Sequence, residues 1–155
     1  MHRVEIYLKS HLPDARGLNL VRDIADLGIT TVSNVRVVDI YWLDADLPPE
    51  QLDLICHRLL ADPVTQYYRC QPDPSDENGI DSDYHTVEVT YNAGVANPID
   101  DTIMKAVRDL AVEDVSGIKT ANRYLIQGQL NARQLETICR RLLVNPIIQH
   151  IVEPA

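Results

Sequence analysis

The sequence lacks the short motifs by which catalytic centres are usually found. It contains no glycine-rich phosphate loop, no Gly-x-Ser-x-Gly elbow, no His-Glu-x-x-His and no Cys-x-x-Cys. A chain of 155 residues that catalysed a reaction by itself would need some such constellation. The absence argues against an enzyme in its own right and leaves a binding or structural role as the better hypothesis. We expect no catalytic residue, bound cofactor or metal.

The sequence also has no long apolar run and only three cysteines. No apolar stretch approaches the about 18 residues that a membrane-spanning helix needs, and the N-terminus lacks a signal-peptide pattern. We therefore expect a soluble, cytoplasmic protein that does not contact the membrane. Cys56 and Cys139 fall at apolar helix positions, which favours buried free thiols over a disulfide or metal role, and Cys70 stands alone.

Positive charge is scarce, and the negative charge is unevenly placed. The net charge is −9, and residues 71–84 contribute five acidic side chains and no basic one. Proline, serine, asparagine and glycine in the same stretch predict a solvated linker. A metal-binding loop is the less favoured interpretation, because the carboxylates lack the spacing of a calcium loop. Nothing concentrates positive charge, so nucleic-acid binding is disfavoured.

What the sequence does contain is an internal repeat. Residues 2–68 align without a gap on residues 85–151 at a constant offset of 83, and 18 of the 67 pairs are identical. Unrelated chains of this composition would share roughly four, and such self-similarity indicates repeated architecture. We predict two copies of one small fold, at 1–70 and 85–155, joined by a linker at 71–84. Copies of this size bury marginal cores alone, so we expect them to pack into one body.

The strongest block of the repeat predicts a helix that ends at a proline. It reads QLDLICHRLLADPVTQ in the first copy and QLETICRRLLVNPIIQ in the second, with apolar residues at helical spacing. Pro63 and Pro146 disfavour helical geometry in the residue before them. The chain should therefore turn there and enter short terminal strands at 64–69 and 147–152.

The earlier part of each copy predicts a strand, a helix and an extended central segment. Apolar and polar residues alternate in the opening segment, and a core-facing helical stripe follows. Asn97-Pro98 is a helix start signal, and Asp14 is a weaker one in the first copy. The central segments 32–45 and 115–128 are rich in β-branched and aromatic residues, and each is expected to form two strands or one bent strand.

These elements predict an α+β fold. Each copy has the order β-α-β-β-α-β, and the two copies form a pseudo-dimer with antiparallel sheets and outer helices. Glu5 and Glu88 alternate with apolar strand residues, so they should face away from the core or toward the seam between the copies. The equivalent histidines, His2 and His85, are expected to have a structural role.

Each copy resembles the PurS family. The family pattern runs from an opening strand through a helix, a Val-Arg strand segment and a helix ending in Cys-x-x-Leu-Leu-Ala-Asn-Pro-Val. The matching stretches here are Val35-Arg36, 56–64 (CHRLLADPV) and 139–147 (CRRLLVNPI). The chain departs from the pattern in the second copy, where Lys119 replaces an arginine and the Asp-Pro-x-Gly helix start lacks its glycine.

The resemblance implies a non-catalytic component of phosphoribosylformylglycinamidine synthase in de novo purine synthesis. PurS acts there as a dimer that bridges a glutaminase (PurQ) and a synthetase (PurL) and aids ammonia transfer. ATP, Mg and glutamine are used by those partner components. Two copies in one chain are similar to the N-terminal region of longer fused synthases, and the chain is either such a portion or a free subunit.

The copies have diverged in the segment that leads into the first helix, since 10–17 and 93–100 share no residue at aligned positions. We therefore expect one copy to face the synthetase and the other the glutaminase, because linked copies are free to diverge. The residues expected near the partner interface are His11, Arg16, Arg36, Tyr41, Lys119 and Tyr124.

One alternative from another class stays open. Tandem ACT-like modules also pair βαββαβ units and bind amino acids at the seam, where a glycine in the loop after the first strand allows close backbone approach. Ser10-His11-Leu12-Pro13 has no glycine, whereas Asn92-Ala93-Gly94 has one. An amino-acid-sensing regulatory module would gain thermal stability from its effector.

Overall fold

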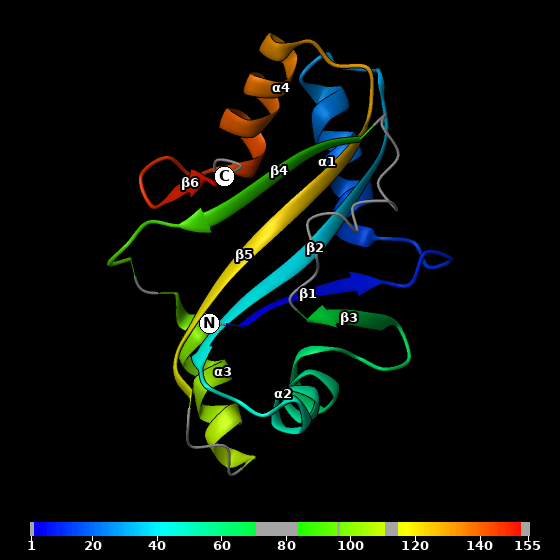
Figure 1. The fold of residues 1–155 in the computed structure, drawn as a ribbon. Coiled ribbons are helices and arrows are strands. Elements are labelled where there is room, and N and C mark those ends of the chain that lie inside the picture. The colour runs from blue at the N-terminus through cyan, green and yellow to red at the C-terminus, as the bar shows by residue number, and fades with distance from the viewer. Residues whose placement is uncertain (1, 71–83, 96, 111–114, 153–155) are drawn as a thin grey trace.

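Two unlike copies of one unit are joined side by side in the computed structural model, which describes residues 2–70, 84–95, 97–110 and 115–152. Figure 1 shows the elements along the chain. They are β1 (His2–Leu8), α1 (Ala15–Asp26), β2 (Val32–Ala45), α2 (Pro49–Ile55), the π-helix η1 (Cys56–Leu60), β3 (Gln66–Cys70), β4 (Tyr84–Tyr91), α3 (Pro98–Asp109), β5 (Val115–Gly128), α4 (Ala132–Ile138), the π-helix η3 (Cys139–Leu143) and β6 (Gln149–Ile151). Apart from Tyr84, the predicted linker lies outside the described residues.

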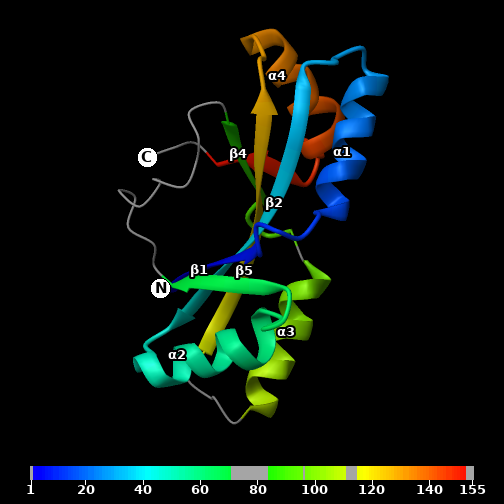
Figure 2. The same ribbon diagram turned by 90° about the vertical axis from the view of Figure 1, so that its right-hand side faces the viewer.

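All six strands belong to one antiparallel sheet in the order β3-β1-β2-β5-β4-β6. The predicted α+β fold with antiparallel strands is confirmed, and the sheets of the two copies are continuous through β2 and β5. These two strands run side by side in both views of the ribbon (Figures 1 and 2).

The β2–β5 pairing relates the copies by a pseudo-two-fold axis. Asp39 faces Asn122, which is its own equivalent at the offset of 83. Arg36 faces Leu125 and Trp42 faces Lys119, and these two pairs exchange under the same offset. The seam is thus isologous: each copy uses the same strand in the same register.

The helices form two groups, and each group mixes the copies. Helix α1 contacts η3 of the second copy, and α3 contacts η1 of the first. Figures 1 and 2 show α1 with α4 at one end of the long strands and α2 with α3 at the other. A helix therefore finds its neighbouring helix in the other copy.

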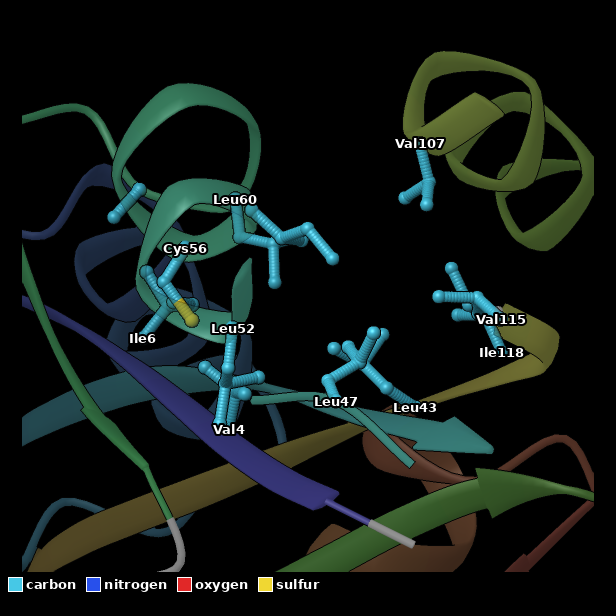
Figure 3. Packing of buried hydrophobic residues seen from close by; sticks show 12 residues of the cluster. Val4, Ile6, Leu43, Leu47, Leu52, Cys56, Leu60, Val107, Val115 and Ile118 are labelled. Atoms are coloured by element: carbon cyan, nitrogen blue, oxygen red, sulfur yellow. The ribbon is translucent and has the colours of Figure 1, made fainter. Parts of the chain in front are cut away.

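The two main hydrophobic cores are shared in the same way. One core contains Val4, Ile6, Leu52 and Ile55 of the first copy together with Val107, Val115 and Ile118 of the second, and Figure 3 shows most of these residues from close by. The other contains Ile24, Ile29, Val32 and Val35 of the first copy together with Val87, Val89, Ile126 and Ile138 of the second. Each copy leaves part of its apolar surface uncovered unless the other is present.

The predicted helix starts are confirmed by their caps. The Asp14 carboxylate accepts a hydrogen bond from the Gly17 amide, and the Asn97 side chain accepts one from Ile99 with Pro98 in the first turn. Helix α4 adds a capping box between Asn131 and Gln134. These bonds satisfy amide groups that the helix itself leaves without an acceptor.

The structure departs from the expectation in three details. Each central segment is one continuous strand over the expected bounds, so each copy has the order β-α-β-α-β, because pairing along the whole seam holds the 14-residue strands extended. The second helix of each copy closes with a π turn, in which the Ala61 and Val144 amides donate to the carbonyls of Cys56 and Cys139. Strands β3 and β6 differ from the predicted ranges at their ends, because β3 begins two residues later and ends one residue later than 64–69, and β6 covers only three residues inside 147–152.

Because both copies contribute to each core, we predict that the chain unfolds in one transition. Ile55 is fully buried, and Ile55→Ala should lower the free energy of unfolding by about 2–5 kcal/mol through lost contacts and an unfilled cavity. Urea denaturation followed by circular dichroism measures both quantities. Val64→Ala, at a side chain 75% exposed, is the control and should change stability by less than about 0.5 kcal/mol. Two separate transitions, one unaffected by the Ile55 change, would contradict the shared core.

Candidate partner interface

Three of the predicted interface residues meet on the helix side of the pseudo-two-fold axis. Arg16, in the first turn of α1, donates to both carboxylate oxygens of Asp39 at 2.9 and 3.0 Å. Tyr41 on β2 and Tyr124 on β5 each lie two residues along their strand from the paired residues Asp39 and Asn122. The charges of Arg16 and Asp39 act on both tyrosine hydroxyl groups. The predicted residues Arg16, Tyr41 and Tyr124 are therefore gathered around Asp39, a residue that was not predicted.

The polar groups of this site differ in exposure, since the two tyrosines are partly buried and Arg16 is half exposed. Burial raises the pKa of both Tyr41 and Tyr124, so their hydroxyl groups stay protonated and available as hydrogen-bond donors. The Arg16 side chain is 51% exposed, and its bidentate bond holds the planar guanidinium in a fixed orientation. The site thus presents one oriented cation and two phenolic hydroxyls along the seam.

The two helices that flank the axis contact the sheet by different means. In the first copy, a Cβ atom on Gly17 would lie 1.7 Å from the Val35 carbonyl oxygen, so the helix rests directly on the strand backbone. The Asp14 carboxylate also accepts a bond from the Val37 amide at 2.8 Å. Glycine is required at position 17 because any other side chain would separate α1 from β2.

In the second copy, side chains make the equivalent contact. Thr120 stands where the first copy has Val37, and its hydroxyl accepts a bond from Asn97 at 2.7 Å and donates to Asp100 at 3.2 Å. Asp100 occupies the position equivalent to Gly17, and burial raises the pKa of its carboxyl group. The missing glycine of the second copy is thus accommodated by a hydrogen-bonded chain of side chains between α3 and β5.

The other predicted interface residues are not part of this site. Arg36 donates to the carbonyls of Leu12 and Lys9 at 2.7 and 3.2 Å, so it holds the loop before α1. His11 is exposed in that loop, and Lys119 is exposed on β5. Arg36 acts on the loop's shape, whereas His11 and Lys119 are open to solvent.

On the opposite face of the sheet lies an ion cluster that joins the copies. Arg3 contacts Glu5 at 3.1 Å and Glu88 at 2.6 Å, while Arg123 contacts Glu5 at 2.9 Å and Glu88 at 3.4 Å. The Glu5 side chain is 3% exposed. Two carboxylates and two guanidinium groups balance the charge, which lets the cluster be buried.

Sequence reasoning found half of this cluster. The alternation rule placed Glu5 and Glu88 away from the core or toward the seam, and the structure places both in the cluster that joins the copies, with Glu5 buried. It missed Arg3 and Arg123, because their equivalents are Thr86 and Ile40 and the repeat therefore carried no signal.

Aromatic side chains border the ion cluster. Arg3 lies over the Trp42 ring at 5.0 Å, Tyr7 stacks on Tyr67 at 5.1 Å, and the Tyr7 hydroxyl donates to Glu5 at 2.7 Å. Burial and the bond to Glu5 raise the pKa of Tyr7 to about 12. The neutral phenol is thus part of the buried network, because it supplies Glu5 with one more donor.

Two exposed apolar residues stand at equivalent turns, and the sequence pattern did not indicate them. Val64 is 75% exposed and Ile147 is 84% exposed. The backbone amide of Val64 donates to the Asp62 side chain, and that of Ile147 donates to the Asn145 side chain. These hydrogen bonds fix the backbone of each turn. The turns are also closed by Gln66 and Gln149, whose side chains accept bonds from the amides of Asp62 and Asn145.

A shallow cavity lies near the first of these turns. Its volume is about 360 Å³, and its lining residues are Lys9, His57, Ala61, Pro63, Gln66, Tyr67 and Tyr68.

No group of three or more histidine, cysteine or acidic side chains suited to a metal ion occurs among the described residues. In the same part of the chain, no helix is long and apolar enough to cross a membrane.

Comparison with known proteins places both copies in one family. The model of the PurS family, described as phosphoribosylformylglycinamidine (FGAM) synthase, matches residues 1–73 and again residues 84–153. The chain belongs to the PurS family. A search of curated proteins found no match.

Solved PurS structures are similar to one half of this PurS-family chain. PurS from B. subtilis, in its C2 crystal form, is 26% identical with a TM-score of 0.39, and the match covers 46% of this chain and 96% of that one. PurS from Methanocaldococcus jannaschii is 25% identical with a TM-score of 0.38, covering 46% and 94%. That protein is one of the subunits of formylglycinamide ribonucleotide amidotransferase in the purine biosynthetic pathway.

The ion cluster leads to a prediction about stability. Glu5→Gln removes one buried carboxylate and leaves two guanidinium groups facing Glu88 alone, so the free energy of unfolding should fall by about 3 kcal/mol. Denaturant titration at neutral pH measures the change. Glu136→Gln, on the exposed side of α4, is the control and should stay within about 0.5 kcal/mol of the parent chain. Equal effects of the two changes would mean that the cluster does not hold the copies together.

Tyr7 gives a prediction for alkaline pH. Its pKa is higher in the folded protein than in the unfolded chain, so folding favours the protonated phenol, and this contribution is present below about pH 10. It should be lost as the pH rises toward 12. The stability difference between the parent chain and Tyr7→Phe should therefore shrink or reverse over that interval, as measured by urea denaturation at several pH values. A difference that is constant with pH would show that the phenol does not titrate with folding.

Proposed function

We propose that this chain is the PurS component of FGAM synthase, in which it joins the glutaminase and synthetase parts and aids ammonia transfer between them. The observation that supports the proposal is the match of the PurS model to both copies, 1–73 and 84–153. The chain itself contributes no catalytic residue in this proposal. ATP, Mg and glutamine are used by the partners.

The arrangement of the copies suits a bridge between two different partners. The β2–β5 seam joins the two copies into one continuous sheet, which supports a defined position of a partner at one end relative to a partner at the other. Covalent linkage also makes the pairing of copies independent of protein concentration. A cytoplasmic location follows from the proposed place in purine synthesis.

Equivalent surfaces on the two copies differ in their chemistry. The α1 start carries exposed Arg16, whereas its equivalent in α3 is Ile99, an apolar side chain 57% exposed. We assign three kinds of surface to partner contact. They are the site around Asp39 with Arg16, Tyr41 and Tyr124, the loop that contains His11, and the turns of Val64 and Ile147. Lys119 lies on the sheet between the copies, and Arg36 acts by holding the loop.

Complex formation with the predicted partners is the first test. The chain is mixed with the glutaminase and synthetase components of its own organism, with glutamine and magnesium-ADP, and analysed by light-scattering chromatography. We expect a stable complex that contains one copy of this chain. If the chain elutes alone and amino acids raise its melting temperature, the assignment is wrong and the ACT-like sensing role replaces it.

The second test asks whether the copies face different partners. Exchange of 10–17 with 93–100 is unsuitable, because it places Asp100 at position 17, where even a Cβ meets the Val35 backbone. Point changes at the exposed turns avoid this problem. Val64→Asp and Ile147→Asp should each weaken the binding of one component at least tenfold, and not the same one, because a buried unpaired carboxylate is costly at an interface.

Binding is measured for each component separately, and circular dichroism confirms that both variants stay folded. Val64→Ala and Ile147→Ala are the matched controls, and they should lose less affinity than the aspartate variants. Weakened binding of the same component by both variants, or of neither, would contradict the assignment of one copy to each partner.

A further inference from the structure

Two cysteines of the first copy approach each other between η1 and the end of β3. The sulfur atoms of Cys56 and Cys70 are 3.6 Å apart. Cys56 is fully buried among Val4, Ile6 and Leu52, as Figure 3 shows, whereas Cys70 is partly exposed and packs against the same core. A disulfide requires a sulfur separation of about 2.05 Å, so the atoms need to approach by roughly 1.5 Å.

The second copy does not repeat this pair. Cys139 is equivalent to Cys56 and is buried in the same way, but the residue equivalent to Cys70 is Glu153. The pairing of thiols is therefore a feature of one copy. It also makes Cys139 an internal control of matched environment.

We propose that Cys56 and Cys70 form a redox site that a low-molecular-weight disulfide converts into an intramolecular protein disulfide. The thiolate of partly exposed Cys70 attacks one sulfur of the small disulfide, forms a mixed disulfide and releases the other half as a thiolate. The thiolate of Cys56 then attacks the Cys70 sulfur and displaces the second half. Two protein thiols lose two protons and two electrons, and the small disulfide is reduced to two thiols.

The surroundings determine when this reaction runs. Burial raises the pKa of both the Cys56 and Cys70 thiols, so the attacking thiolates are scarce at neutral pH. The two thiols are thus oxidised slowly at neutral pH, and the reaction accelerates as the pH rises because the thiolate fraction increases. The new bond ties the last residue of β3, which pairs with Val4 of β1, to the first residue of η1.

Closure restrains an edge of the sheet. Strand β3 has β1 as its neighbour on one side and no neighbour on the other among the described residues. Fixing its end to the helix layer limits separation of β3 from the sheet. The oxidised chain should therefore melt roughly 5 °C above the reduced chain, since a short loop is closed in the unfolded state.

The full chain is incubated with glutathione disulfide at mildly alkaline pH, and intact mass, peptide mapping and thiol titration follow the products. We expect a mass lower by two hydrogen atoms, a peptide that links Cys56 to Cys70, and one remaining thiol, at Cys139. Reduction with dithiothreitol should restore all three thiols. Cys139→Ser should keep the link, and Cys70→Ser should abolish it.

Several results would overturn the proposal. These are three intact thiols after a small model thiol is fully oxidised under the same conditions, a stable glutathione adduct on Cys70 with Cys56 still reduced, or disulfides between chains. A linked product that melts below the reduced chain would show that closure strains the fold and would refute the restraint of β3. None of these outcomes depends on the glutaminase or synthetase components.

Discussion

The antiparallel pairing of β2 with β5 is the interaction on which the rest of the structure depends. It joins two three-stranded halves into one sheet, and it brings helices of one copy over apolar strand residues of the other. Without this pairing, α1 would lose its neighbour η3, and both cores would open on one side. The copies are repeats in sequence but one cooperative body in space, because each core needs residues from both.

Linking the copies allows the seam to become asymmetric. In a symmetric dimer of either copy, the residue at position 39 or 122 would face itself, and two aspartates would place like charges directly opposite. Here Asp39 faces Asn122, and Arg16 holds the single carboxylate. The same freedom appears at the helix starts, where a glycine contact in one copy is replaced by the Asn97, Thr120 and Asp100 side chains in the other. Such differences are what the proposed bridge between unlike partners requires.

Local patterns predicted the elements well where one residue type decides the geometry. Pro63 and Pro146 end the second helices, and Asp14 and Asn97 begin the first helices, because a ring or a cap acts within a few residues. The continuity of β2 was not decided locally. Either two strands or one was compatible with residues 32–45, and the long partner strand made the difference.

The candidate site was predicted only in part, because some of its residues carry a signal in the sequence and others are brought in by contacts between distant strands. Tyr41 and Tyr124 are identical residues at equivalent positions of the repeat, and Arg16 belongs to the diverged segment 10–17, so all three could be expected near the interface, whereas Asp39 gave no local signal. The ion cluster joins β1, β4 and β5, and its arginines occur in one copy each, so no periodicity indicated them. The approach of Cys56 to Cys70 likewise joins a helix to a strand edge.

The sequence by itself determined the duplication, the α+β class, the PurS resemblance and the ends of most helices, since all of these follow from residue order and short-range stereochemistry. The tertiary structure decided which copy covers which core, how the central strands pair, and which charges meet across the seam. These features depend on contacts between residues far apart in the chain. Such contacts arise from burial and backbone pairing of the whole sheet, which neither copy specifies alone.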